Sequence, residues 1–188
     1  SNTEPAAVKK FSDANFLQVP NVLTALQQLA THHRHQFSLP VIGITGSNGK
    51  TIVKEWLFQL LGDKYNIIRS PKSYNSQVGV PLSIWNMSEA HTLALIEAGI
   101  SKPGEMEKLQ QMIEPEIGVF TYIGDAHAEG FTGLQEKVNE KLKLFTNSKT
   151  LVFCADDVLL AESILQFRKN VNKELNLFGW SKNPGTDL

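Results

Sequence analysis

The chain has 188 residues, of which 41% are hydrophobic and 20% charged, and its formal net charge is −1. This composition is ordinary for a soluble globular domain with one sizeable core, and the near-zero charge argues against a general nucleic-acid or anionic-membrane surface. A single cysteine, Cys154, excludes a disulfide framework within the chain, and no apolar run approaches the ~20 residues of a membrane span.

Apolar periodicity and turn residues divide the chain into alternating helices and strands. The first 20 residues are polar and irregular, and the chain starts Ser-Asn rather than Met, so we expect a linker or tag remnant there. Helices are predicted over 21–35, 51–61, 103–112, 133–145 and 156–167. Strands are predicted over 41–44, 66–69, 93–96, 117–121, 150–154 and 174–178. The alternation favours an α/β fold, with a largely parallel sheet and helices on both faces.

The most informative segment joins the first predicted strand to the helix that follows it. It reads Ile42-Gly-Ile-Thr-Gly-Ser-Asn-Gly-Lys-Thr51. In a strand–turn–helix unit, backbone N–H groups and the helix N-terminus converge on an anion, Lys50 would neutralise phosphate charge, and the Thr51 hydroxyl would reach a magnesium ion. The ordinary phosphate loop has glycine where this chain has Ile44, so an accidental glycine turn is the alternative interpretation.

Four segments together carry a family resemblance. The loop Thr45-Gly-Ser-Asn-Gly-Lys-Thr51 resembles the ATP-binding loop of the Mur ligases, which form amide bonds in peptidoglycan precursor synthesis. Three more segments follow in the family's order: 70–82, ending in Gly-Val-Pro-Leu; 94–99, continuing to Pro-Gly-Glu at 103–105; and 123–131, containing Ala-His-x-Glu-Gly-Phe. The combination is most similar to the members that add D-alanyl-D-alanine to UDP-N-acetylmuramoyl-tripeptide. Ile52, Ser73 and Tyr122 depart from residues that are common in the family, but none of these changes removes a metal ligand or the loop lysine.

The resemblance implies a P-loop NTPase-like fold. Residues 21–188 would form the family's central ATP-binding domain, incomplete at its C-terminal end, with the UDP-sugar domain and the C-terminal domain absent. We therefore expect no ligase turnover from this chain alone. The implied partners of the whole enzyme are UDP-N-acetylmuramoyl-tripeptide and D-alanyl-D-alanine, and the implied location is cytoplasmic. The oligomeric state is left open.

The resemblance also implies the cofactors ATP and Mg²⁺ and assigns residues to them. The implied nucleotide-binding residues are Thr45, Gly46, Ser47, Asn48, Gly49, Lys50, Thr51 and Asn75. The implied metal ligands are Thr51, Glu97, His127 and Lys141, the last as a carbamate formed with CO₂, and the implied catalytic residues are Lys50, His127 and Lys141. Taken by itself, Glu97 ends an apolar strand beside the loop, where a carboxylate suits magnesium. A surface glutamate at a strand end is the alternative.

Lys141 also has a helical-wheel argument. In the helix predicted over 133–145, Leu134, Val138, Leu142 and Phe145 form an apolar stripe. At ~100° per residue, Lys141 lies about 55° from the centre of that stripe and Lys143 about 145° away. Lys141 is therefore predicted at the boundary of the buried face and Lys143 in solvent. The alternative for Lys141 is a snorkelling surface lysine.

Two other functions stay open from the sequence. One is another ligase of the same superfamily, either a sibling amino-acid-adding ligase or folylpolyglutamate synthetase. The other is a nucleotide-binding module without catalysis, which the presence of Lys50, Thr51, Glu97, His127 and Lys141 argues against.

Overall fold

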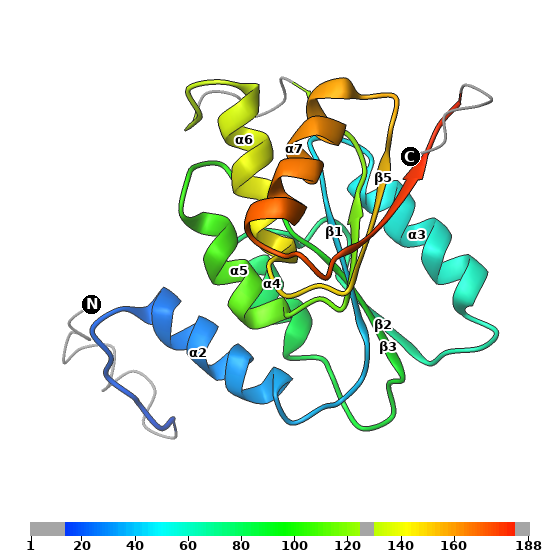
Figure 1. Ribbon diagram of the computed structural model, residues 1–188. Coiled ribbons are helices and arrows are strands. Elements are labelled where there is room, and N and C mark those ends of the chain that lie inside the picture. Colours follow the sequence, from blue (N-terminus) through cyan, green and yellow to red (C-terminus); the bar gives the residue numbers. More distant parts are fainter. Residues whose placement is uncertain (1–13, 125–129, 183–188) are drawn as a thin grey trace.

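The computed structural model describes residues 14–124 and 130–182 (Figure 1). Its centre is a six-stranded sheet in the order β2-β3-β1-β4-β5-β6, and every neighbouring pair is parallel. The strands are β1 (Val41–Thr45), β2 (Ile67–Arg69), β3 (Leu93–Glu97), β4 (Ile117–Phe120), β5 (Thr150–Cys154) and β6 (Asn176–Trp180). The α/β fold with a parallel sheet, predicted from the sequence, is confirmed.

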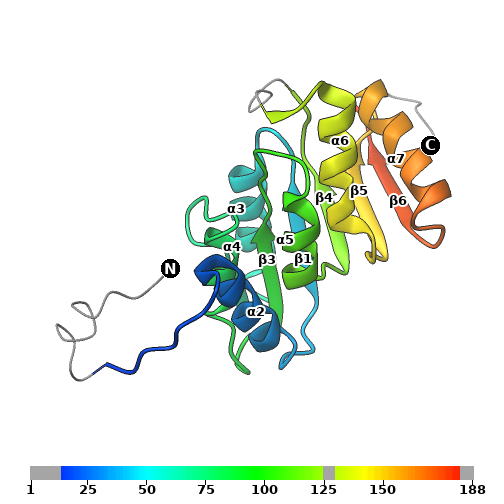
Figure 2. The same cartoon turned by 90° about the vertical axis from the view of Figure 1, so that its left-hand side faces the viewer.

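The helices cover the two faces of the sheet unequally. They are α2 (Val22–Arg34), α3 (Lys50–Leu61), α4 (Gly79–Ile84), α5 (Glu105–Ile113), α6 (Leu134–Leu142), the short 3₁₀ helix η2 (Lys143–Phe145) and α7 (Val158–Asn170). Figures 1 and 2 show α5, α6 and α7 in a layer on one face, with α3 on the other. The larger core lies under the α5–α7 layer, and a smaller one lies between α3 and the sheet.

Strand β1 lies between these two cores because its residue types suit both. All five of its residues are buried, as expected for a central parallel strand. Ile42 and Ile44 pack in the α3 core, whereas Val41 packs in the larger core. Glycine is needed at position 43, on the side of the larger core, because a Cβ there would lie 2.8 Å from Pro115.

Side chains cap two helices at their N-termini. The Asn21 side chain accepts a hydrogen bond from Thr24 N at 2.9 Å, which confirms the predicted cap of α2. Asp157 accepts from Leu160 N at 3.1 Å, so α7 begins two residues later than predicted. Helix α5 also begins two residues late, because Gly104 at its N-cap has φ +80° and is not helical. The predicted helix over 133–145 changes to a 3₁₀ turn after Leu142.

The order of the strands determines where a ligand would bind. Strand β1 is flanked by β3 on one side and β4 on the other, so the chain reverses its direction across the sheet at β1. In open parallel sheets, ligands bind at the carboxyl ends of the strands beside such a reversal. The loop after β1 lies at this edge.

No helix in the described ranges is both long and apolar enough to span a bilayer.

Candidate functional site

The loop between β1 and α3 has a backbone that requires its two glycines. Gly46 has φ +142°, and a Cβ there would lie 2.1 Å from Thr121 Oγ1. Gly49 is the N-cap of α3, with φ +84°. Both values lie in the region that favours glycine. The loop therefore delivers the chain to the N-terminus of a 12-residue helix, the geometry that binds phosphate groups.

A second segment, residues 121–124, holds this loop in place after β4 ends. Ser47 N donates to Tyr122 O at 2.7 Å, and Ser47 Oγ donates to Gly124 O at 3.0 Å. Thr121 Oγ1 donates to Asn48 O at 2.6 Å. The predicted loop residues are thus held in place by hydrogen bonds to residues that lie far away in the sequence.

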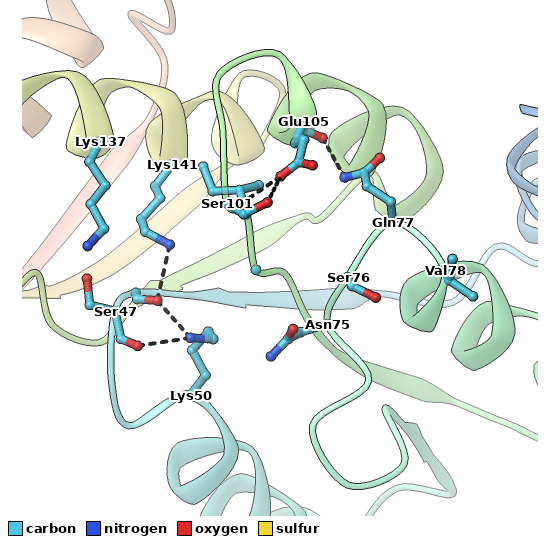
Figure 3. Close-up of a pocket in the computed structure, with 13 residues that line it drawn as sticks. Ser47, Lys50, Asn75, Ser76, Gln77, Val78, Ser101, Glu105, Lys137 and Lys141 are labelled. Carbon is cyan, nitrogen blue, oxygen red and sulfur yellow. Dashed lines mark hydrogen bonds between the residues drawn. The ribbon is translucent and has the colours of Figure 1, made fainter. Parts of the chain in front are cut away.

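Three lysines line one cavity of about 350 Å³ beside the loop. Lys50 Nζ donates to Gly46 O at 2.8 Å and to Ser47 O at 3.2 Å, and Lys141 Nζ donates to Gly46 O at 3.2 Å. Lys137, one turn before Lys141 on α6, extends toward the same loop (Figure 3) and donates to Gly124 O. The cavity thus gathers positive charge where a phosphate would lie.

Burial and neighbouring positive charges lower the pKa of two of these lysines, Lys50 and Lys141. Burial lowers the pKa of Lys141 to about 7, and the charges of Lys50 and Lys137 act in the same direction. Burial also lowers the pKa of Lys50, with Glu97 opposing and Lys137 adding to the effect. The Lys141 side chain is only 2% exposed. It is therefore more deeply buried than the predicted boundary position, and part of it is neutral near pH 7.

Two of the predicted magnesium ligands, Thr51 and Glu97, meet on the other side of the loop. Thr51 Oγ1 donates to Glu97 Oε2 at 3.1 Å, and Asn75 Nδ2 lies 3.5 Å from the same oxygen. Glu97 is fully buried, which contradicts the alternative of a surface glutamate. Its other oxygen, Oε1, lies 2.8 Å from Lys54 Nζ.

These oxygens fit a magnesium ion, although they are few. Within residues 14–124 and 130–182, no three His, Cys, Asp or Glu side chains are grouped to hold a metal ion. Magnesium commonly takes one or two protein oxygens, with phosphate oxygens and water completing the shell. The Thr51 hydroxyl and the buried Glu97 carboxylate form such a pair, next to the phosphate loop.

Some predicted residues have other partners or are not described. Thr45 is buried and its hydroxyl donates to Ala98 O at 2.9 Å, so this side chain ties β1 to the end of β3. His127 lies outside the described residues. Lys143 is 38% exposed rather than fully solvated, because it pairs at 2.8 Å with Glu107 and with Glu140. Both carboxylates raise the pKa of Lys143.

Two residues at the site were not predicted from the sequence. Lys137 precedes Lys141 by four positions, and residues four apart share a helix face, so the helical-wheel argument could have included it. Lys54 has no comparable signal. It lies on α3 next to Glu55 and is completely buried, whereas charged residues on helices are usually exposed.

Comparisons with known proteins agree with this geometry. The Mur ligase middle domain family matches residues 44–186. The chain is 34% identical over 145 residues to a UDP-N-acetylmuramoyl-tripeptide–D-alanyl-D-alanine ligase from Bacillus subtilis (strain 168), covering 76% of this chain and 32% of the relative.

Two solved structures are similar as well. The MurF structure from Acinetobacter baumannii has a TM-score of 0.79 at 26% identity, covering 89% of this chain and 37% of that one. MurF from Thermotoga maritima, in complex with ADP, has a TM-score of 0.76 at 30% identity, covering 89% and 38%. This chain thus spans about a third of the length of these proteins. Since its loop, lysine cluster and buried glutamate lie within the matched residues, the chain belongs to the Mur ligase family through the middle domain of that family.

Proposed function

We propose that this chain is the ATP-binding core of a ligase that adds D-alanyl-D-alanine to UDP-N-acetylmuramoyl-tripeptide through an acyl phosphate. The observation that carries the proposal is the convergence of Lys50, Lys137 and Lys141 on the loop at Gly46, with Thr51 and Glu97 beside it. The names of the relatives supply the substrates. Residues 1–20 would be a linker or tag remnant before the domain.

The chemistry requires two anions to meet, the substrate carboxylate and the γ-phosphate of ATP. The N–H groups of the loop and the α3 N-terminus would hold the β- and γ-phosphates. Lys50 Nζ, which donates to the loop carbonyls of Gly46 and Ser47, would exchange these acceptors for phosphate oxygens. The positive charge would reduce repulsion as the carboxylate approaches the phosphorus.

Magnesium would bind through Thr51 and Glu97, and when bound it would supply further charge neutralisation at the phosphates. Asn75 would keep the Glu97 carboxylate turned toward Thr51. On the α6 side, the neutral amine of Lys141 would attack CO₂, forming a C–N bond and releasing one proton. The resulting carbamate would offer oxygen ligands for a second magnesium together with His127.

The remaining parts of the proposal concern the whole protein. The tripeptide and dipeptide substrates must be held together for acyl transfer, since proximity supplies much of the rate. The matched region covers only about a third of the relatives' length, so we assign those contacts to segments outside the matched region. A cytoplasmic location would follow from the use of ATP and a UDP-linked precursor.

Calorimetry with ATP and Mg²⁺ tests the nucleotide site. We expect the wild-type chain to bind and Lys50→Ala to bind at least 100-fold more weakly, because this ammonium contacts the phosphate loop directly. Lys64→Ala, at an exposed lysine beyond the end of α3, is the matched control and should bind like wild type. Equal binding by Lys50→Ala and Lys64→Ala would contradict the proposal.

Carbon-13 NMR tests the proposed modification of Lys141. The chain is equilibrated with ¹³C-bicarbonate in the presence of ATP and Mg²⁺, and a carbamate resonance is expected that Lys141→Ala lacks and Lys143→Ala retains. A resonance that survives in Lys141→Ala would assign the carbamate to another amine.

A further inference from the structure

Lys54 lies completely buried next to the proposed metal site, and it has no part in the proposed chemistry. Its ammonium lies 2.8 Å from Glu97 Oε1 and 3.3 Å from Glu55 Oε1. It also donates to two backbone carbonyls, Ser70 O at 2.7 Å and Lys72 O. The ammonium, which has three donors, is thus surrounded by four oxygens.

The Glu97 carboxylate has two different sides. Oε2 faces Thr51 and Asn75, the side of the phosphate loop. Oε1 faces Lys54 but receives no well-aligned hydrogen bond from the described part of the chain. The direction of the carboxylate on this side therefore depends on the charge of Lys54.

The turn at Ser70–Lys72 is held by the same ammonium. Glu97 N donates to Ser70 Oγ at 3.1 Å, and Lys72 has a left-handed backbone with φ +48°. This turn leads directly to Asn75, whose backbone carbonyl accepts from Gly99 N at 2.7 Å. Lys54 thus connects α3, the end of β3 and the segment that carries Asn75.

We propose that Lys54 is a positioning residue that sets the Glu97 carboxylate and the Asn75 segment relative to the phosphate loop, so that Oε2 faces the magnesium ion. The inference rests on the proposed function, because it presumes magnesium at Thr51 and Glu97. The ammonium holds Oε1 and the turn from behind, and leaves the front of the carboxylate for the ion. Residues behind metal ligands often fix the orientation of those ligands in this way.

The sign of one measurement separates positioning from simple electrostatics. By Coulomb's law alone, removal of a positive charge 2.8 Å from Glu97 strengthens the binding of a cation to that carboxylate. Positioning predicts the opposite, because the carboxylate and the turn lose their common anchor. The quantity to measure is the ratio of the affinities for a non-hydrolysable ATP analogue with Mg²⁺ and with EDTA.

Three variants of the chain decide the matter by calorimetry. In Lys54→Gln, we expect this ratio to fall about tenfold, the scale typical for loss of a residue behind a metal ligand. The affinity in EDTA should stay within about twofold. Lys54→Arg, which keeps the charge and the donors, should recover part of the ratio. Glu55→Gln, which removes only the half-exposed second carboxylate, is the control and should match wild type.

Each outcome supports or overturns the inference. An unchanged or increased ratio in Lys54→Gln overturns it and leaves the proposed function intact. Nucleotide binding that Lys50→Ala does not weaken overturns the proposed function itself, and a wild-type ratio of one overturns the metal site and the role of Lys54 together. If Lys54→Gln does not fold, the ¹⁵Nζ resonance of Lys54 in the wild-type chain decides. It should shift when Mg²⁺ is added to the analogue-bound chain, and an unmoved resonance overturns the inference.

Discussion

The two sides of the phosphate loop are charged in opposite ways. On the β3 side, the fully buried Glu97 meets Lys54, Thr51 and Asn75, so the carboxylate is surrounded by donors before any ligand binds. On the α6 side, the ammonium groups of Lys50, Lys137 and Lys141 face one cavity, where burial and then the neighbouring lysine charges lower the pKa of Lys50 and of Lys141. One side is compensated within the protein, whereas the other carries repulsion that an incoming anion would relieve.

Under the proposed function, this difference would let a single loop serve two kinds of ligand. A metal ligand must keep its direction, and a compensated ion pair maintains that direction without nucleotide. A phosphate site must attract a strongly charged anion, and closely spaced lysines do so at the expense of the stability of the free protein. We therefore expect substitutions on the two sides to change stability in opposite directions.

The largest effect is expected on the compensated side. Lys54→Met leaves the Glu97 carboxylate buried beside two backbone carbonyls without its cation. The free energy of unfolding should fall by about 3–5 kcal/mol, as measured by urea unfolding followed by circular dichroism. The double variant Lys54→Met with Glu97→Gln removes both charges and should regain at least half of the loss. A double variant no more stable than Lys54→Met would show that the pair is not what stabilises this side.

On the lysine side we expect the opposite sign. Lys141→Met replaces a buried ammonium with an apolar chain of similar length, and should raise the free energy of unfolding by about 1–2 kcal/mol at pH 7 in CO₂-free buffer. The pKa of Lys141 is about 7 in the folded chain, whereas an exposed lysine has a pKa of 10.5, so wild-type stability rises with pH between these values. The advantage of Lys141→Met should therefore shrink from pH 7 to pH 9. A wild-type chain more stable than the variant at pH 7 would contradict the repulsion.

A smaller effect is expected from Lys137 on anion binding. Lys137→Met should bind inorganic triphosphate about fivefold more weakly than wild type, because one of the three charges facing the cavity is lost. The shift of thermal unfolding with triphosphate concentration measures this affinity. Lys149→Met, whose side chain is 75% exposed beside Glu116, controls for general charge. If the two variants bind alike, Lys137 does not contribute to the anion site.

The smallest effect is expected at Lys143, which follows Lys141 by two residues and lies outside the cluster. Its pair with Glu107 lies at the surface, and the buried Glu140 keeps its hydrogen bonds from Gly104 N and Met106 N, so Lys143→Ala should lower the free energy of unfolding by only about 1 kcal/mol. Nucleotide affinity should stay within about twofold of wild type. Calorimetry and urea unfolding on the same preparation check both values, and a large loss of affinity would place Lys143 in the site.

Sequence patterns predicted those features of the structure that depend on residues close together in the chain. The phosphate loop is contained in Thr45–Thr51, so its glycines, lysine and helix start could be predicted from spacing alone. The periodicity of α6 predicted Lys141 at the boundary of the buried face, but neither its full burial nor the 3₁₀ turn after Leu142 could be predicted from it. The short helix α4 was missed because it contains Gly79 and Pro81, residues that usually mark turns.

The burial of Lys54 could not be predicted, because this part of helix α3 exposes apolar side chains and buries a charged one. Ile52 and Trp56 are 57% and 62% exposed, while Lys54 between them is 0% exposed. The partners of Lys54 at Ser70 and Glu97 lie 16 and 43 positions away, and the parallel pairing of β3 with β1 brings Glu97 beside the loop. Tertiary contacts decide such a position, and a local pattern contains no sign of them.

We propose above all that the loop at Gly46–Thr51 holds the phosphates of ATP, with a metal ion between Thr51 and Glu97. Crystals of this chain grown with Mn²⁺ and a non-hydrolysable ATP analogue test it most directly, because manganese scatters anomalously. We expect an anomalous peak within bonding distance of Thr51 Oγ1 and Glu97 Oε2, with the γ-phosphate between Lys50 and α6. Phosphates bound to the loop with the metal elsewhere, or an analogue bound away from the loop, would contradict it.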